Sequence, residues 1–320
     1  MNSVATRTPT VFAVSEIKDD GSTSPIRGAS PVLPLLVMAV VVVVWGLGPP
    51  TTKLVTAPPL IGTFVRFGIS SPLLIVVLAA RRRVLSRKVF IATALPGLSF
   101  GINLIFVFAT LQEATVSVLS TVVAMQPALL LVLAGPLFRE YPTSRQLAFT
   151  LAGVVGAVGV ILGAGSEIRS SWLGVGLAAL SLVTFTLYFV LTRLARSEDE
   201  VDPIEWMAGI NIWAFLSTIV PILLLADRSD WAQFGGKDWL WIAVVAFVTG
   251  VFGHVLMTWL HGHLEAARSS LYILTMHLVA VGLAWWIHDE SVTWLQMVSG
   301  GVVLLCVALV VSAPDRHEVR

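Results

Sequence analysis

Charged residues are scarce in this sequence. Only 12% of its 320 residues are charged, whereas 56% are hydrophobic, and a soluble domain usually carries about 25% charged residues. So few charges do not cover the water-facing surface of a soluble chain of this length. The hydrophobic residues also fall in long blocks, and a helix needs about 20 apolar residues to span a bilayer. The composition therefore predicts a polytopic membrane protein.

Cysteine is almost absent, and several enzyme motifs are missing altogether. The one cysteine, Cys306, lies in an apolar block, which excludes a disulfide within the chain and disfavours a thiolate metal site. The sequence contains no Walker loop, no Gly-x-Gly-x-x-Gly before a helix and no Gly-x-Ser-x-Gly. The net charge of +1 gives no indication of a nucleic-acid partner. We expect no cofactor, no metal, no nucleic acid and no enzymatic activity.

Ten apolar blocks have the length of membrane-spanning helices. We place them at 33–55, 58–80, 89–111, 115–138, 146–165, 172–193, 205–226, 239–260, 265–288 and 294–312. Residues 1–32 are polar and lack the apolar core and cleavage site of a signal peptide, so we expect a disordered cytosolic tail there. Residues 313–320 form a second tail. The predicted fold class is an all-α membrane protein with ten transmembrane helices.

The distribution of Lys and Arg predicts the orientation of these spans. If the N-terminus is cytosolic, most Lys and Arg residues fall in the inside segments, as the positive-inside rule requires. The densest group stands between the second and third spans and contains Arg81, Arg82, Arg83, Arg87 and Lys88. An odd number of spans would break this alternation. We therefore expect a multi-pass protein of the plasma (inner) membrane with both termini in the cytosol.

The two halves of the chain share a short motif. Segments 140–146 and 290–296 both read Glu-x-x-Thr-x-x-Gln, and each stands between the fourth and fifth spans of its half. Because a five-helix unit has an odd number of spans, its second copy must be inverted in the membrane. The Thr and Gln have capping-box spacing, and a Glu is favoured near a helix N-terminus. We interpret six residues as structural helix caps: Glu140, Thr143, Gln146, Glu290, Thr293 and Gln296.

Several further motifs stand in a characteristic order along the chain. They are Trp45-Gly46 followed by Lys53 in the first span, Arg66-Phe67 in the second, Gln126-Pro127 in the fourth, and Ala267-Arg268-Ser269-Ser270 at the start of the ninth. Together with the two Glu-x-x-Thr-x-x-Gln segments, these motifs make the chain resemble the drug/metabolite transporter superfamily, in its EamA-type ten-helix group. The resemblance implies two inverted five-helix repeats, at 33–165 and 172–312, around a central cavity that works by alternating access.

Polar side chains inside the spans are the candidates for substrate binding. Ionisable residues at this depth are costly and usually face a cavity or a partner. His277 is at the centre of the ninth span, where the family usually has Pro, and His254 lies in the eighth. Histidine can carry a proton near neutral pH, so both are candidates for substrate binding and proton coupling. The alternative is a neutral histidine bonded to a neighbouring helix. The remaining substrate-binding candidates are Gln126, Asn103, Tyr188 and Thr184.

Two basic residues have a structural interpretation at this stage. Lys53 resembles an anchor at the end of the first span, and Arg66 in the second span is expected to bind a carbonyl or a helix end.

The scarcity of charge within the spans restricts the substrate. No Asp or Glu lies deep in a span, and Arg66 is the one deep Arg, so a phosphorylated substrate would lack the cationic contacts it needs. We expect a secondary transporter that moves a small neutral, zwitterionic or moderately apolar metabolite by alternating access. Its cavity would be lined by spans 1, 3, 4, 6, 8 and 9. Export driven by a gradient, with proton coupling as an option, fits the resemblance.

Two other functions remain open on the sequence. One is an intramembrane enzyme built on the histidines, and the other is a membrane scaffold or receptor that transports nothing. The expected partners are a small-molecule substrate and the lipid bilayer, and the sequence is compatible with a homodimer.

Overall fold

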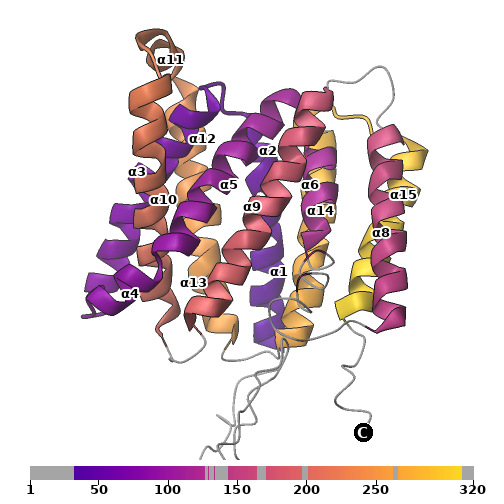
Figure 1. The fold of residues 1–320 in the computed structure, drawn as a ribbon, viewed down its shortest axis with the longest axis horizontal. Coiled ribbons are helices and arrows are strands. Elements are labelled where there is room, and N and C mark those ends of the chain that lie inside the picture. Colours follow the sequence, from indigo (N-terminus) through magenta and orange to yellow (C-terminus); the bar gives the residue numbers. More distant parts are fainter. Residues whose placement is uncertain are drawn as a thin grey trace, which may run out of the picture.

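The computed structural model describes residues 32–126, 129, 133, 143–163, 171–196, 201–261 and 266–311. Within these residues all regular structure is helical, and most of the long helices run between the two ends of one bundle (Figure 1). The elements of the first half are α1 (Val32–Gly46), α2 (Gly48–Lys53), α3 (Pro59–Ala80), α4 (Arg87–Ala92), α5 (Ala94–Glu113), α6 (Val116–Ala124) and α8 (Ser144–Gly163).

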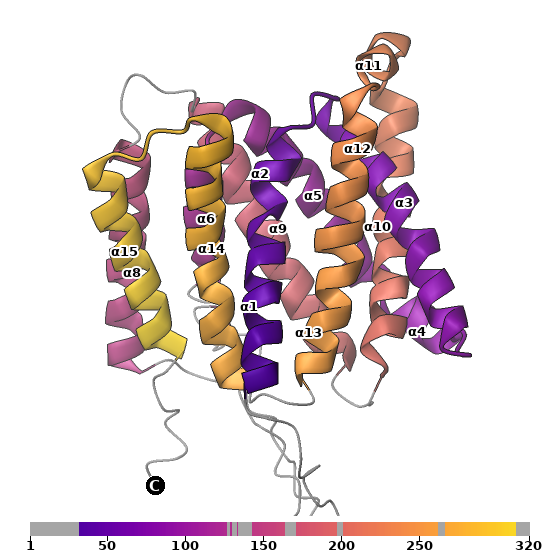
Figure 2. The same cartoon turned by 180° about the vertical axis from the view of Figure 1, so that it is seen from behind.

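The second half has a similar series of helices. They are α9 (Trp172–Arg196), α10 (Pro203–Leu225), α11 (Arg228–Gln233), α12 (Lys237–Val244), η1 (Val245–Phe252), α13 (Gly253–His261), α14 (Ala266–His288) and α15 (Trp294–Val311). Helix α1 begins at the lower end of the bundle, and helix α15 ends there too, as the two opposite views show (Figures 1 and 2).

Many of the helices are long and apolar enough to cross a membrane. Six segments of the described chain meet that standard, and two shorter apolar helices accompany them, at Leu147–Val160 and Trp294–Cys306. The six are Leu33–Lys53, Pro59–Ala80, Ala94–Glu113, Trp172–Thr192, Pro203–Leu225 and Lys237–Met257. Their apolar side chains face outward as well as inward: Leu223, Leu224 and Leu225 at the end of α10 are each at least 75% exposed.

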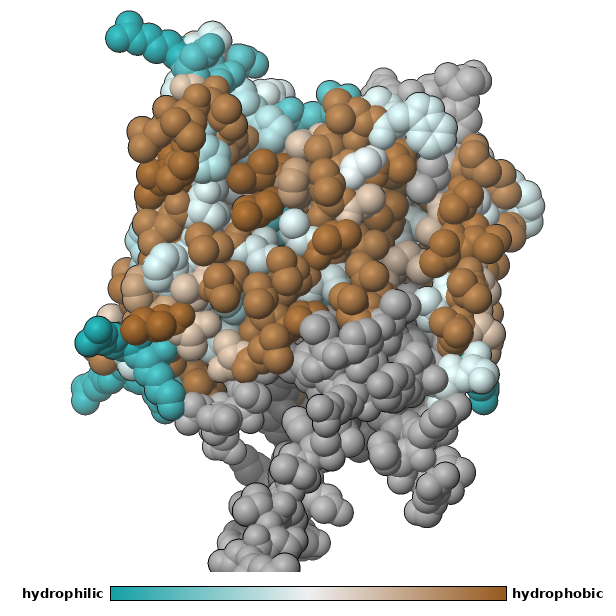
Figure 3. All heavy atoms as spheres, viewed as in Figure 1, coloured by the Kyte–Doolittle hydropathy of each residue, from teal (hydrophilic) through white to brown (hydrophobic). Residues whose placement is uncertain are grey.

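The coloured surface has the pattern of a protein embedded in a bilayer. On the face in Figure 3, hydrophobic residues cover the middle of the bundle, and hydrophilic residues gather near α11 at the top and near α4 at the bottom. Exposing so broad an apolar band to water is unfavourable, whereas contact of this band with lipid tails is not.

Two predicted spans are divided by turns. The first bends at Leu47 into α1 and α2, and Pro49 and Pro50 lie in the first turn of α2, where a missing N–H costs nothing. The third is divided at Thr93 into α4 and α5. In the fourth span, α6 ends at Ala124. Most of the remainder of 115–138, including Pro127, is outside the described residues.

The eighth span contains a wide helical turn that the hydropathy pattern does not indicate. Residues Val245–Phe252 form the π-helix η1 between α12 and α13. Side chains bind carbonyl groups around this turn: Thr249 Oγ1 donates to Val245 O at 2.7 Å, and His254 Nδ1 contacts Gly250 O. A π turn accommodates an extra residue within a helix.

Close glycine contacts bring α5 against α10. A Cβ at Gly97 would collide with Trp213 and with the carbonyl of Ile210, and a Cβ at Gly101 would collide with Ser217 and Ala214. Small residues spaced in this way allow helix backbones in a membrane to approach closely. At the other side of the molecule, α8 and α15 pack along each other as a pair (Figures 1 and 2).

Candidate functional site

His277 lies halfway along α14 and borders a cavity of about 210 Å³. The walls come from α6, α8, α14 and α15, together with Val292 before α15. Besides His277, its polar lining residues are Ser117, Ser120 and Thr121 on α6 and Gln296 on α15. The other residues lining it are apolar or glycine, and the described lining contains no Asp, Glu, Lys or Arg. The cavity thus offers a few hydrogen-bonding groups on a mainly apolar wall.

Two polar atoms of the segment that begins with α6 are buried without a hydrogen-bond partner in the described chain. They are the hydroxyl oxygen of Ser120, which lines the cavity, and the amide nitrogen of Gln126. A buried polar atom that lacks a partner costs roughly 1–3 kcal/mol. A ligand group that reached the Ser120 hydroxyl would remove this cost.

Asn103 and Thr184 lie together where α5 packs on α9. Asn103 Nδ2 donates to Ser181 O at 2.8 Å, to Ser181 Oγ at 3.0 Å and, more weakly, towards Thr184 Oγ1 at 3.5 Å. Ser99 Oγ donates to Thr184 O at 2.9 Å. These bonds join the two helices and occupy the Asn103 amide group.

Tyr188 belongs to an aromatic group on the same two helices. Its ring lies 4.9 Å from that of Phe100 on α5, 6.1 Å from Phe185 and 5.2 Å from Phe189, measured between ring centroids. This group provides an apolar wall next to the polar contacts of Asn103.

His254 packs against the first span. Its ring centroid lies 5.3 Å from that of Trp45, and Gly253 is required there because a Cβ would collide with the Trp45 indole. The indole nitrogen of Trp45 is buried without a partner in the described chain. Arg66 has its guanidinium carbon 5.9 Å from the ring centroid of Phe67. The sequence did not indicate the packing of His254 on Trp45, because the two residues come from different spans.

The structure distributes the candidate residues over three places. It joins Asn103 with Thr184 and His254 with Trp45, and it places His277 beside a cavity between α6, α8, α14 and α15. A cavity between the two halves, lined by spans 1, 3, 4, 6, 8 and 9, stays a prediction. Glycines 300 and 301 on α15 leave room for the cavity beside His277, and hydropathy alone does not reveal such a shape.

The second Glu-x-x-Thr-x-x-Gln motif forms a capping box at the start of α15. Thr293 N donates to Gln296 Oε1 at 3.0 Å, and Gln296 N donates to Thr293 Oγ1 at 3.2 Å. Thr293 Oγ1 also donates to Gly163 O at the end of α8, at 2.7 Å. In the first motif, Glu140 is outside the described residues. Thr143 directly precedes α8, and Gln146 lies in its first turn.

Glu290 differs from this expectation. Its carboxylate accepts hydrogen bonds from Val116 N at the start of α6, at 3.0 and 3.1 Å, rather than from the helix that follows it. It also pairs with Lys53, which the sequence suggested was an end anchor. Residues so distant in sequence give no local signal of contact.

Replacing Thr293 with Val should destabilise the protein without changing what it binds. The substitution removes the cap and the bond to Gly163, and a lost cap typically costs about 1 kcal/mol. We expect a lower melting temperature in detergent and an unchanged ligand profile. Ser291→Ala, at an exposed neighbour, is the control. A changed ligand profile at unchanged melting temperature would contradict the capping role.

The comparisons with known proteins identify the family. The sequence profile described as the EamA-like transporter family matches twice, at residues 32–162 and 172–312. A solved crystal structure, titled only as that of a protein, is similar in fold with a TM-score of 0.58 at 17% identity, covering 88% of this chain and 98% of its own.

One curated relative also matches in part. It is the heme-binding subunit MsrQ of the protein-methionine-sulfoxide reductase from Ralstonia nicotianae, 27% identical over 120 residues, which are 34% of this chain and 54% of the relative. The chain thus spans about half the length of this relative. With the family match over both halves and the many apolar helices, this chain is an integral multi-pass membrane protein and belongs to the EamA-like transporter family of the drug/metabolite transporter superfamily.

Proposed function

We propose that this protein is a secondary transporter that moves a small neutral, zwitterionic or moderately apolar metabolite across the plasma membrane. The observation that carries the proposal is the cavity beside His277. Its described walls combine hydroxyl groups, one histidine and one glutamine with apolar side chains, and they include no fixed charge. A phosphorylated or strongly charged solute would lose its hydration there without compensation.

We also propose ten spans in two inverted repeats, with both termini in the cytosol. Two observations support this topology. The start of α1 and the end of α15 lie at the same end of the bundle, and the basic segment 81–88, which runs from the end of α3 into α4, lies at that end too (Figures 1 and 2). Segments rich in Lys and Arg favour the cytosolic side.

The proposed driving force is a gradient, with export as the direction. The sequence contains no nucleotide-binding motif, so a proton or the substrate itself would supply the energy. His277 and His254 are the candidates for a coupled proton, because histidine changes charge near neutral pH.

A ligand screen followed by a flux assay tests the proposal. Purified protein is heated with amino acids, sugars, nucleosides and apolar amines, and a ligand that binds the folded state raises the melting temperature. Compounds that stabilise the protein then enter a counterflow assay in proteoliposomes. We expect counterflow for an uncharged or zwitterionic compound. Stabilisation by phosphorylated compounds alone, or binding with no flux of any compound, would contradict the proposed function.

A further inference from the structure

Lys53 and Glu290 form a buried ion pair between the two halves of the chain. Lys53 Nζ lies 2.7 Å from Glu290 Oε1, and the two side chains are only 15% and 4% exposed. Lys53 is the last residue of α2, and Glu290 lies in the connection from α14 to α15. Both segments are at the upper end of the bundle, opposite the start of α1 and the end of α15 (Figures 1 and 2).

Further hydrogen bonds hold each partner of the pair. Lys53 Nζ also donates to Ala114 O, at 2.8 Å, and the Glu290 carboxylate accepts from Val116 N. Ala114 and Val116 stand on either side of the turn that begins α6. The pair therefore fastens α2, the start of α6 and the end of α14 to one another.

The backbone around Glu290 directs its side chain to this place. Asp289, directly after α14, is left-handed with φ of 51°, a conformation that Asp tolerates better than most residues. One residue earlier, His288 Nε2 lies 2.8 Å from the Pro50 carbonyl oxygen of α2. The end of α14 and the residues after it thus meet α2 at two places, His288 on Pro50 and Glu290 on Lys53.

A pair of this kind is suited to breaking and reforming. Removing two charges from water costs nearly as much as their attraction returns, unless further hydrogen bonds complete the geometry. With those bonds the closed arrangement is stable, and when the helices part, water can solvate both charges. The two arrangements then differ little in free energy, as a switching element requires.

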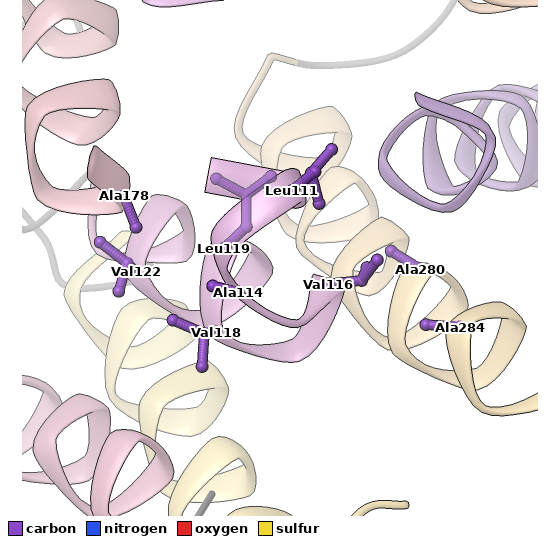
Figure 4. Close-up of a cluster of buried hydrophobic side chains, with 9 residues drawn as sticks. All are labelled: Leu111, Ala114, Val116, Val118, Leu119, Val122, Ala178, Ala280 and Ala284. Atoms are coloured by element: carbon purple, nitrogen blue, oxygen red, sulfur yellow. The ribbon is translucent and has the colours of Figure 1, made fainter. Parts of the chain in front are cut away.

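We propose that the Lys53–Glu290 pair is a latch that closes this end of the bundle and opens in each transport cycle. This rests on the proposed transport function, in which access must alternate between the two ends. Beneath the latch, α5, α6, α9 and α14 share a cluster of buried apolar side chains, with Val116 pointing toward Ala280 and Ala284 (Figure 4). Opening the latch exposes this cluster to water.

A cysteine at position 284 reports on the latch. Ala284 is fully buried in the closed structure, and its carbonyl oxygen accepts from Glu290 N at 3.5 Å. In a Cys306→Ser background, Ala284→Cys is combined with Glu290→Gln or Lys53→Met in nanodiscs. Its reaction with a hydrophilic thiol reagent is then timed. We expect both latch variants to react about tenfold faster than the protein with an intact latch, which is within the usual range of coupling between sites.

Two controls separate latch opening from general loosening. Ala208→Cys places a thiol in the buried cluster of α3 and α10, near the opposite end of the bundle. Lys237→Gln removes an exposed cation at the start of α12 without affecting the pair. We expect the latch variants to leave the reaction rate of a thiol at position 208 unchanged. We expect Lys237→Gln to leave the reaction rate of the thiol at position 284 unchanged. If Glu290→Gln does not fold, Lys53→Met carries the test, because it leaves the bonds between Glu290 and Val116 in place.

The reaction rates at positions 284 and 208 together test the latch. Faster reaction at position 284 alone supports the latch. An unchanged rate at position 284, or faster reaction at both 284 and 208, overturns it, because the pair would then be idle or merely structural. The transport assay is read separately. If position 284 responds as expected while no compound is transported, the proposed function fails, and the pair then only keeps this end of the bundle closed. If the unmodified protein transports but position 284 does not respond, only the latch fails.

Discussion

A His277→Ala variant is expected to transport its substrate about tenfold more slowly, or worse, while remaining folded. His277 is the one side chain in the described cavity lining that can both hydrogen-bond to a ligand and take up a proton. Loss of one hydrogen bond to a buried ligand costs on the order of 1.4 kcal/mol, which is a factor of ten. The measurement is initial flux in proteoliposomes between pH 6 and 8, with the melting temperature as a check on folding.

Two companion variants sharpen this test. His277→Gln keeps a hydrogen-bonding group but cannot take up a proton, so retained exchange with lost response to a proton gradient would assign coupling to the histidine. Trp286→Ala removes a larger side chain from the exposed face of the same helix, where Trp286 is 74% exposed, and should leave flux unchanged. Flux of His277→Ala at the unmodified rate across this pH range would exclude His277 from transport.

A Gly101→Val variant is expected to lose stability more severely than any other single change suggested here. A Cβ at position 101 would overlap Ser217 and approach the Ala214 carbonyl oxygen, so α5 and α10 would have to separate. Overpacking of this kind typically costs about 1–3 kcal/mol and sometimes more. We expect a melting temperature lower by roughly 5 °C or more in the same detergent.

Gly176→Val is the matched control for this substitution. Gly176 is also within a long helix, α9, but it is exposed and no described atom would lie within 4 Å of its added Cβ. The intrinsic helix propensity changes equally at the two positions. Equal melting temperatures for the two variants would show that close packing of α5 on α10 contributes nothing to stability.

The helical character and the approximate spans could be predicted because they depend on local properties. A run of apolar residues determines a membrane helix wherever it occurs, so α3, α9, α10 and α15 lie close to the predicted ranges. The breaks inside spans depend on tertiary packing instead. Thr93, between α4 and α5, is fully buried, and its hydroxyl bonds to Val89 O and Phe90 O, which the hydropathy pattern does not encode.

In the candidate site, too, local contacts could be predicted from the sequence and long-range contacts could not. The capping box of Thr293 and Gln296 follows from a spacing of three residues, and the sequence displays it directly. The pairing of Lys53 with Glu290 and the packing of His254 on Trp45 join positions far apart in the chain. A single sequence does not indicate which distant residues are in contact. Lys53 therefore looks like a simple anchor in the sequence, although in the structure it pairs with Glu290.

The wide turn at Val245–Phe252 keeps the helix beyond it facing its neighbours. An α-helix advances by about 100° per residue, so one residue inserted into a regular helix would rotate everything beyond it by that angle. A π turn absorbs the extra residue instead, and Met257 and Leu260 remain buried against α1. A relative lacking one residue in this stretch would therefore form a regular helix with the same inner surface, and an alignment gap within 245–252 marks a lost π turn rather than a rotated α13.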